Sequence, residues 1–147
     1  MLKRLISHRG NINGKNVELE NQPKYIEDAL AQGFDVAVDV WFVNGEFYLG
    51  HDNPQYYINR IFLMNEKIWC HAKNIEALYE LMHINHVHYF WHQNDDYTLT
   101  SRNVIWAYPG KKLTSNSICV LPELNQIGKY ILNECLGVCS DNITDFL

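Results

Sequence analysis

Two histidines stand in short motifs in the first third of the chain, Ile6-Ser7-His8-Arg9-Gly10 and Leu49-Gly50-His51-Asp52. Between them lie the pair Glu20-Asn21 and the strand-like run Val36-Ala37-Val38-Asp39-Val40. Imidazoles give and take protons near neutral pH, and carboxylates can hold a metal ion against a phosphate. The combination indicates phosphodiester chemistry. Ala37 stands two positions before Asp39, where a second carboxylate would be useful, so the site is either altered or incomplete.

Each of these residues also has a structural interpretation. Glu20-Asn21 precedes Pro23 and is equally typical of a helix-capping turn, because Asn is a good N-cap. Asp39 lies among Val and Trp residues, where an unpaired carboxylate is costly, so a site role is favoured. Lys73 follows an apolar run and is interpreted in the same way. For His71 both interpretations stay open.

Short apolar runs that must position these residues recur along the chain. The expected strands cover residues 4–7, 35–42, 46–49, 67–72, 87–91, 103–106, 117–121 and 137–140. Asn44-Gly45 suits a tight turn and predicts a hairpin of the second and third strands. Most runs are apolar throughout, as in parallel strands covered on both faces. Helices are expected over residues 23–32, 74–83 and 124–132.

About eight strands, several of them followed by helices, predict an α/β fold of the compact (β/α)8 TIM-barrel type. Such a barrel typically uses ~250 residues. This chain offers about 18 residues for each strand and its connection (147 divided by 8). We therefore expect several outer helices to be shortened or missing. Because bare strands expose apolar faces and edges, we also expect a homo-oligomer that covers them.

Composition narrows the class of protein. The chain has 147 residues, of which 47% are hydrophobic, enough for a single domain over residues 1–147. A formal charge of -5 argues against a nucleic-acid partner, which would require clustered Lys and Arg. No apolar stretch is long enough to span a bilayer, and residues 1–4 lead into a strand rather than a signal-peptide core. We expect a cytoplasmic protein without stable membrane insertion, whose four cysteines are buried and reduced.

The order of these motifs resembles the glycerophosphodiester phosphodiesterase family. The resemblance rests on His8-Arg9-Gly10, Glu20-Asn21, Val38-Asp39-Val40 and His51-Asp52, where the family has His-Arg-Gly, Glu-Asn, Glu-x-Asp and His-Asp. Later, Cys70-His71-Ala72-Lys73 resembles the family's Glu-x-Lys, and Gly137-Val138-Cys139-Ser140-Asp141 resembles its closing Gly-x-x-(Thr/Ser)-Asp. The match is dense over the first third of the chain and sparse after it. The family fold is a TIM barrel, similar to that of phosphatidylinositol-specific phospholipase C.

The resemblance also implies roles for individual residues. His8 and His51 match the family's acid/base pair. Arg9 matches a contact to a phosphate oxygen, for which a forked guanidinium is suited. Lys73 matches the lysine that stabilises the charged phosphoryl group. Asp39 matches a metal ligand, and Glu20 is expected to share the ion with it.

Two departures bear on the metal. Ala37 replaces the Glu of Glu-x-Asp, and His71 replaces an acidic residue ahead of the lysine. Mg²⁺ and Ca²⁺ prefer oxygen ligands, so their affinity should fall, although they stay the first expectation. With His71 as a ligand, Mn²⁺ or Zn²⁺ becomes an alternative. The predicted function is hydrolysis of a small glycerophosphodiester-like substrate with a divalent metal; the alternative is a catalytically degenerate phosphate-binding module of the same fold.

Residues later in the chain are candidates for the pocket wall. His92 and Tyr108 fall where strands are expected to end, as do Trp106 and, after Pro122, Glu123. Aromatic residues of this kind more often fill a core than bind a substrate. The remaining histidines do not have the spacing of a second metal site.

Overall fold

Strand β2 (Asp35–Val43) is the organising element of the computed structural model, which describes residues 2–147. Met1, the first residue of the expected 1–147 domain, lies outside this range. One edge of β2 pairs in parallel with β5, while the other pairs first with β1 and then, antiparallel, with β3. Residues 35–40 are buried, as expected of an apolar run covered on both faces.

The strands form one mixed 10-stranded sheet. Its parallel part has the order β6-β5-β2-β1-β10-β9-β8. Three antiparallel strands extend it: β3 on β2, β4 on β3 and β7 on β8. Apart from β2, the bounds are β1 (Arg4–His8), β3 (Glu46–Leu49), β4 (Tyr56–Ile58), β5 (Ile68–Ala72), β6 (His88–Trp91), β7 (Tyr97–Leu99), β8 (Ile105–Ala107), β9 (Ser117–Val120) and β10 (Gly137–Ser140).

The expected (β/α)8 barrel is wrong, because the sheet does not close. Strands β6 and β7 stand at the two ends of the series β6-β5-β2-β1-β10-β9-β8-β7, and only isolated bonds, such as Ser101 N–H to the Tyr89 carbonyl, join their neighbourhoods. Within residues 2–147 there are just three α-helices: α1 (Pro23–Ala31), α2 (Arg60–Leu63) and α3 (Ile75–Leu81). The connection from β8 to β9 is too short for a crossover helix, and the longer connection from β9 to β10 contains 3₁₀ turns in place of one.

The helix expected over residues 124–132 is also absent. Two 3₁₀ turns replace it, η1 (Pro122–Asn125) and η2 (Lys129–Asn133), and a third, η3 (Ile143–Phe146), ends the chain. Gln126 between the first two has a φ of 55°, a left-handed conformation that a continuous α-helix does not accommodate. The helix and hairpin expectations elsewhere are confirmed: α1 and α3 form, and Asn44-Gly45, with φ of 51° and 82°, joins β2 to β3.

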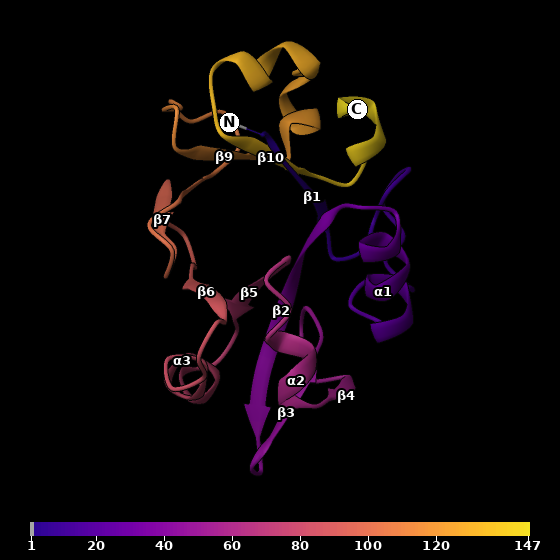
Figure 1. Cartoon of the computed structure of the whole chain (residues 1–147), viewed down its shortest axis with the longest axis vertical. Coiled ribbons are helices and arrows are strands. Elements are labelled where there is room, and N and C mark those ends of the chain that lie inside the picture. The colour runs from indigo at the N-terminus through magenta and orange to yellow at the C-terminus, as the bar shows by residue number, and fades with distance from the viewer. Residues whose placement is uncertain (1) are drawn as a thin grey trace.

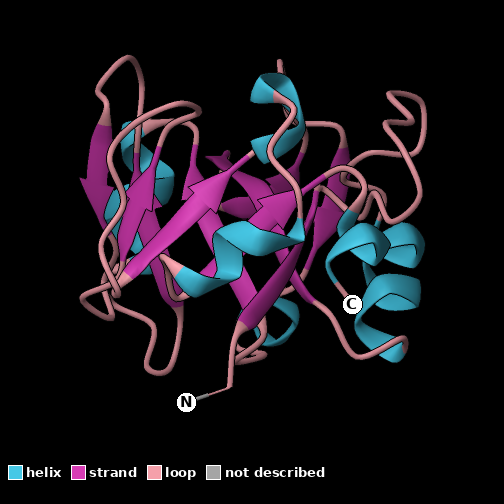
Figure 2. Ribbon diagram, turned by 90° about the horizontal axis from the view of Figure 1, so that it is seen from above, coloured by secondary structure: helices cyan, strands magenta, loops and turns pink. Residues whose placement is uncertain are grey.

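Figure 1 shows the strands arranged along a curve, with α1 and α3 outside it, and Figure 2 shows the same strands grouped centrally with helices around them. Because side chains alternate along a strand, β2 turns Val36, Val38 and Val40 toward the core cluster that includes residues of α1 and α3. Ala37 belongs to another cluster, which fills the inside of the curve. That cluster also contains Ile6, Trp69, Phe90, Trp106, Ile118, Val120, Leu136 and Cys139.

The inner rows of side chains explain how the fold positions a site. On six of the parallel strands, a polar or aromatic residue follows two positions after an inner apolar one, and these strands end at the same side of the sheet. The pairs are Ile6 and His8, Ala37 and Asp39, Trp69 and His71, Phe90 and His92, Trp106 and Tyr108, and Cys139 and Asp141. All four cysteines are buried and free, as expected.

Candidate active site

A cavity of about 420 Å³ lies where these inner rows end. It brings together six of the seven residues that the sequence singles out: His8, Arg9, Asp39, His51, His71 and Lys73. Glu20, the seventh, lies beside it and lines an adjoining cavity with Arg9, Asn21 and His51. The motifs of the first third of the chain and the end of β5 therefore meet in space.

His8 is held at the end of β1 by Asp141. Its Nδ1 lies 2.8 Å from Asp141 Oδ1, which also accepts a hydrogen bond of 2.9 Å from Asn11 Nδ2. Burial by itself raises the pKa of Asp141, but the His8 ring and the Asn11 amide outweigh it and hold the pKa below its ordinary value. An ionised carboxylate only accepts, so Nδ1 of His8 carries a proton toward it and Nε2 is the nitrogen left for chemistry.

Glu123 supports this pair from behind. Its two carboxylate oxygens accept hydrogen bonds of 2.9 Å, one from the Asp141 backbone N–H and one from the Ser140 hydroxyl. Glu123 does not line the cavity, although the sequence indicated it as a candidate for the pocket wall. It fixes the turn after β10 that carries Asp141. Sequence reasoning gave Asp141 no role, and its only signal was the closing motif at residues 137–141.

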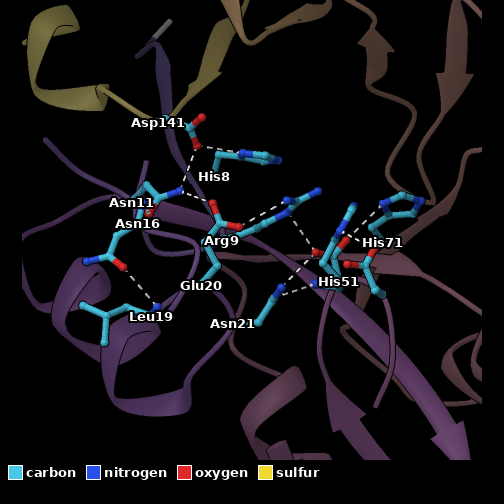
Figure 3. A network of polar contacts seen from close by, with 12 residues as sticks. His8, Arg9, Asn11, Asn16, Leu19, Glu20, Asn21, His51, His71 and Asp141 are labelled. Carbon is cyan, nitrogen blue, oxygen red and sulfur yellow. Dashed lines mark hydrogen bonds and ion pairs between the residues drawn. The ribbon is translucent and has the colours of Figure 1, made fainter. Parts of the chain in front are cut away.

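Arg9 lies between two buried carboxylates (Figure 3). Its Nη1 is 3.3 Å from Glu20 Oε1, and its Nε is 3.0 Å from Asp39 Oδ2. The Nε contact is an ion pair without hydrogen-bond geometry, since Nε is buried and has no hydrogen-bond partner. The backbone of Arg9 is left-handed, with φ of 58°, and the Asn21 N–H donates to its carbonyl at 3.0 Å.

Two amides also donate to the same carboxylates, and on Asp39 the amide shares Oδ2 with Arg9. Asn11 Nδ2 donates to Glu20 Oε2 at 2.7 Å, and Asn21 Nδ2 donates to Asp39 Oδ2 at 2.9 Å. Asn11 is fully buried and also bonds Asp141, so it links Glu20 to the His8 pair. No sequence signal pointed to Asn11.

His71 completes the surroundings of Asp39. Its Nδ1 lies 3.3 Å from Asp39 Oδ1, its Nε2 donates to the His92 carbonyl at 2.9 Å, and its ring stacks on Phe90. Burial raises the pKa of Asp39, but His71, Arg9 and Asn21 together hold that pKa well below its usual range. Both ring nitrogens of His71 are thus engaged within the protein.

The expected metal ligands do not converge on a shared position in this arrangement. Among residues 2–147 no three His, Cys, Asp or Glu side chains are grouped so that they could hold an ion. Glu20 and Asp39 bind Arg9 and two amides, and His71 binds Asp39 and a carbonyl. The donor set that is present does not fit a divalent ion, and the metal stays a prediction from the sequence.

His51 is the more exposed member of the histidine pair, because it sits on the loop after β3. Its side chain is 45% exposed, and Nδ1 lies 2.9 Å from Asp52 Oδ1. The burial of the rest of the ring, together with nearby Arg9, lowers the pKa of His51. The loop itself is anchored, since Gly50 donates its N–H to the Asp39 carbonyl and its own carbonyl accepts from Trp41 Nε1 at 2.7 Å.

The opposite wall of the cavity is aromatic and apolar. The expected candidates His92, Trp106 and Tyr108 line it, and the rings of His92 and Tyr108 stack with centroids 3.9 Å apart. Burial lowers the pKa of His92 and raises that of Tyr108. Further apolar lining includes Val120, Leu121 and Leu124. The cavity therefore offers charge on one side and apolar contact on the other.

Comparison with known proteins found no match to a family model, a curated protein or a solved structure. Across residues 2–147 every helix is too short or too polar to cross a bilayer.

Proposed function

We propose that the chain is a phosphodiester hydrolase that acts on a small glycerophosphodiester-like molecule, the activity that the resemblance of its motifs implies. One observation carries the proposal: His8 and His51 border the same cavity as the cationic side chains of Arg9 and Lys73. Two proton-transfer groups and two cations are what cleavage of an anionic phosphodiester requires. The proposal rests on this constellation and not on a barrel fold.

His8 is assigned as the base. Asp141 fixes its ring with Nε2 unengaged, so Nε2 takes a proton from a water molecule as the water oxygen bonds to phosphorus. His51 is assigned as the acid that protonates the departing alkoxide as the phosphorus–oxygen bond breaks. Its lowered pKa makes its imidazolium a stronger acid. The products are a phosphomonoester and an alcohol. A positioned acid or base typically contributes about 10²–10⁴ in rate.

Arg9 and Lys73 are assigned to the phosphoryl oxygens. Arg9 Nη2 has no hydrogen bond or ion pair to any residue from 2 to 147, and Arg9 lines the cavity. Lys73 begins the segment after β5, where its N–H donates to the Val40 carbonyl at 2.8 Å. The alcohol portion of the substrate would then lie against the wall of Trp106, Tyr108 and Leu124.

Hydrolysis assays test this assignment. A glycerophosphodiester and an activated bis-aryl phosphodiester are incubated with the parent, His8→Ala, His51→Ala and the control His83→Ala, each with a chelator and with Mg²⁺, Ca²⁺, Mn²⁺ or Zn²⁺. His83 is exposed on the segment after α3. We expect each site variant to lose about 10²-fold or more of the turnover and the control to keep it. Turnover that survives both site substitutions would refute the hydrolase.

A phosphate-binding module without turnover is the second candidate. Two observations favour it: the carboxylates are all engaged, and His51 is exposed and paired with the exposed Asp52. Calorimetry separates the two candidates. A phosphodiester that binds to the parent, loses affinity in Lys73→Ala and is not hydrolysed with any of the four ions identifies the module.

The proposal includes a cytoplasmic setting and a homo-oligomer. Four free, buried cysteines suit a reducing compartment. Exposed apolar residues on β4, α2 and β7, among them Tyr57, Ile61 and Leu99, are the surfaces that an oligomer would cover. Size-exclusion chromatography with light scattering at micromolar concentration checks this, and a monomer at every concentration refutes it.

A further inference from the structure

The structure places a guanidinium where a divalent ion was expected. Glu20 is 6% and Asp39 is 3% exposed, and buried carboxylates require a cation to compensate their charge. The contacts of 3.3 Å and 3.0 Å show that Arg9 meets both. We propose that Arg9 is a built-in cation that takes the place of the metal, so that the protein handles its phosphodiester without a divalent ion.

The backbone around Arg9 holds the guanidinium in this place. The Arg9 N–H donates to the Ala37 carbonyl at 2.9 Å, and the Arg9 carbonyl accepts from Asn21 at 3.0 Å. A left-handed φ of 58° is rare for an arginine and costs about 1 kcal/mol or more, so the surrounding contacts must impose it. The Asn21 side chain also holds Asp39, donating to its carboxylate at 2.9 Å and accepting from its backbone N–H at 3.0 Å. Arg9 and its carboxylates are therefore one rigid unit.

Ala37 fits this interpretation. It lies on the inner face of β2, two residues before Asp39, and it is packed with Trp69, Phe90 and Trp106. A third carboxylate at this position would add further negative charge next to two carboxylates that share one guanidinium. With Ala37 instead of a carboxylate, the negative charges of Glu20 and Asp39 both face Arg9, and Asp39 also contacts His71. Ala37, which looks like a lost metal ligand, is therefore the residue expected here if an arginine replaces the metal.

The unengaged part of Arg9 gives this cation a function. Nη1 and Nε face the carboxylates, while Nη2 is not bonded to any described residue and Arg9 lines the cavity. A guanidinium in this position can bind a phosphoryl oxygen as a metal ion would. This last step rests on the proposed function. The exclusion of the metal rests on the contacts of Glu20 and Asp39 alone.

Metal binding tests the inference without any measurement of turnover. Thermal denaturation and calorimetry are performed on the chelator-treated parent, Arg9→Ala, Arg9→Gln and the control Arg60→Ala, each titrated with Ca²⁺, Mg²⁺ and Mn²⁺. Arg60 is exposed on α2 and lies outside the cavity lining. We expect no saturable shift of the melting temperature in the parent or in Arg60→Ala. At least one Arg9 variant should bind an ion about 10-fold or more tightly than the parent, because two carboxylates are freed.

A second substitution locates the new site. Adding Asp39→Asn to the Arg9 variant should abolish the gained binding. Arg9→Gln keeps an amide donor for the carboxylates and serves where Arg9→Ala fails to fold. If neither Arg9 variant is folded, ion binding to the parent is the test. Stoichiometric binding that Asp39→Asn abolishes overturns the proposal, and a parent that binds no ion supports it.

The outcomes also separate this inference from the proposed function. A parent that binds no ion and hydrolyses nothing contradicts the hydrolase and leaves the built-in cation standing. A parent whose turnover is lost with a chelator and restored by a divalent ion contradicts the built-in cation and keeps the hydrolase. Folded Arg9 variants that gain no ion binding also overturn it.

Discussion

Mild acid should destabilise this protein through one buried histidine, His88 on β6. The side chain is 3% exposed, its Nε2 lies 2.6 Å from the Thr100 hydroxyl, and its ring lies 4.0 Å from that of Trp69. Burial, with Arg102 and Arg4 nearby, lowers the pKa of His88 to about 3. In the unfolded chain the pKa is about 6.5.

The sign and size of the effect follow from this difference. Below about pH 6.5 the unfolded chain takes up a proton at His88 and the folded protein does not, so stability falls as the pH falls. At pH 5, about 1.5 units below the unfolded pKa, the loss is about 2 kcal/mol at about 1.4 kcal/mol per unit. It continues toward pH 3, where it reaches at most about 5 kcal/mol.

Urea unfolding at pH 7, 6 and 5, followed by tryptophan fluorescence, measures this loss. The parent is compared with His88→Gln and with the exposed control His83→Gln. A glutamine side chain does not titrate, so His88→Gln should lose about 2 kcal/mol less than the parent between pH 7 and pH 5. The control should match the parent. Asp39 and Asp141, whose pKa values are lowered, add losses only below about pH 4. Parallel curves for the parent and His88→Gln would refute the reasoning.

Three further predictions concern the site and the core. Gly50→Ala should destabilise the protein by about 1–3 kcal/mol, because a Cβ there would lie 2.0 Å from the Asn53 carbonyl oxygen. Since Gly50 precedes His51, the substitution should also weaken phosphodiester binding. Urea unfolding measures the stability and calorimetry the binding, and an unchanged variant contradicts the close approach of Gly50 to Asn53. Asp141→Ala should lower turnover about 10²-fold. In ¹⁵N NMR spectra of this variant, His8 should no longer be held in the tautomer that carries its proton on Nδ1. If that tautomer is retained, Asp141 does not position the ring. Leu49→Ala should cost about 2–5 kcal/mol in urea unfolding, since Leu49 is fully buried, and a cost near zero would mean that β3 is not part of the core.

Local patterns were sufficient to predict the elements that carry the site. The apolar runs located β1, β2, β5 and β10 to within about one residue, and the turn dipeptide located the hairpin. His8 ends the first strand and His51 follows the third, as the sequence indicates, whereas Asp39 lies within β2 and reaches the cavity from there. These features depend on residues close together in the chain, which is why the sequence alone indicates them.

The architecture and the contacts of the site depend on distant residues and were not predictable. Closure of a sheet is decided by connections: the segment expected to be helical after residue 124 is broken by left-handed Gln126 and extended Gly128. Helix α3 shows the same limit: the spacing of Ile75, Leu78, Leu81 and Met82 is typical of a buried apolar stripe, yet Ile75 is 62% exposed. Nothing near His8 in the sequence indicates Asp141, whose contact with it joins residues 133 positions apart.

The pairing of β1 with β10 has a consequence for how the protein is made. Arg4 is in register with Gly137 and Ser7 with Ser140, so β1 leaves the ribosome well before its partner β10 is made. Until then the backbone edge of β1 that β10 will cover is open, which favours pairing with other chains. Synthesis at a low concentration of nascent chains, or with a chaperone that shields that edge, should therefore raise the yield of correctly folded protein.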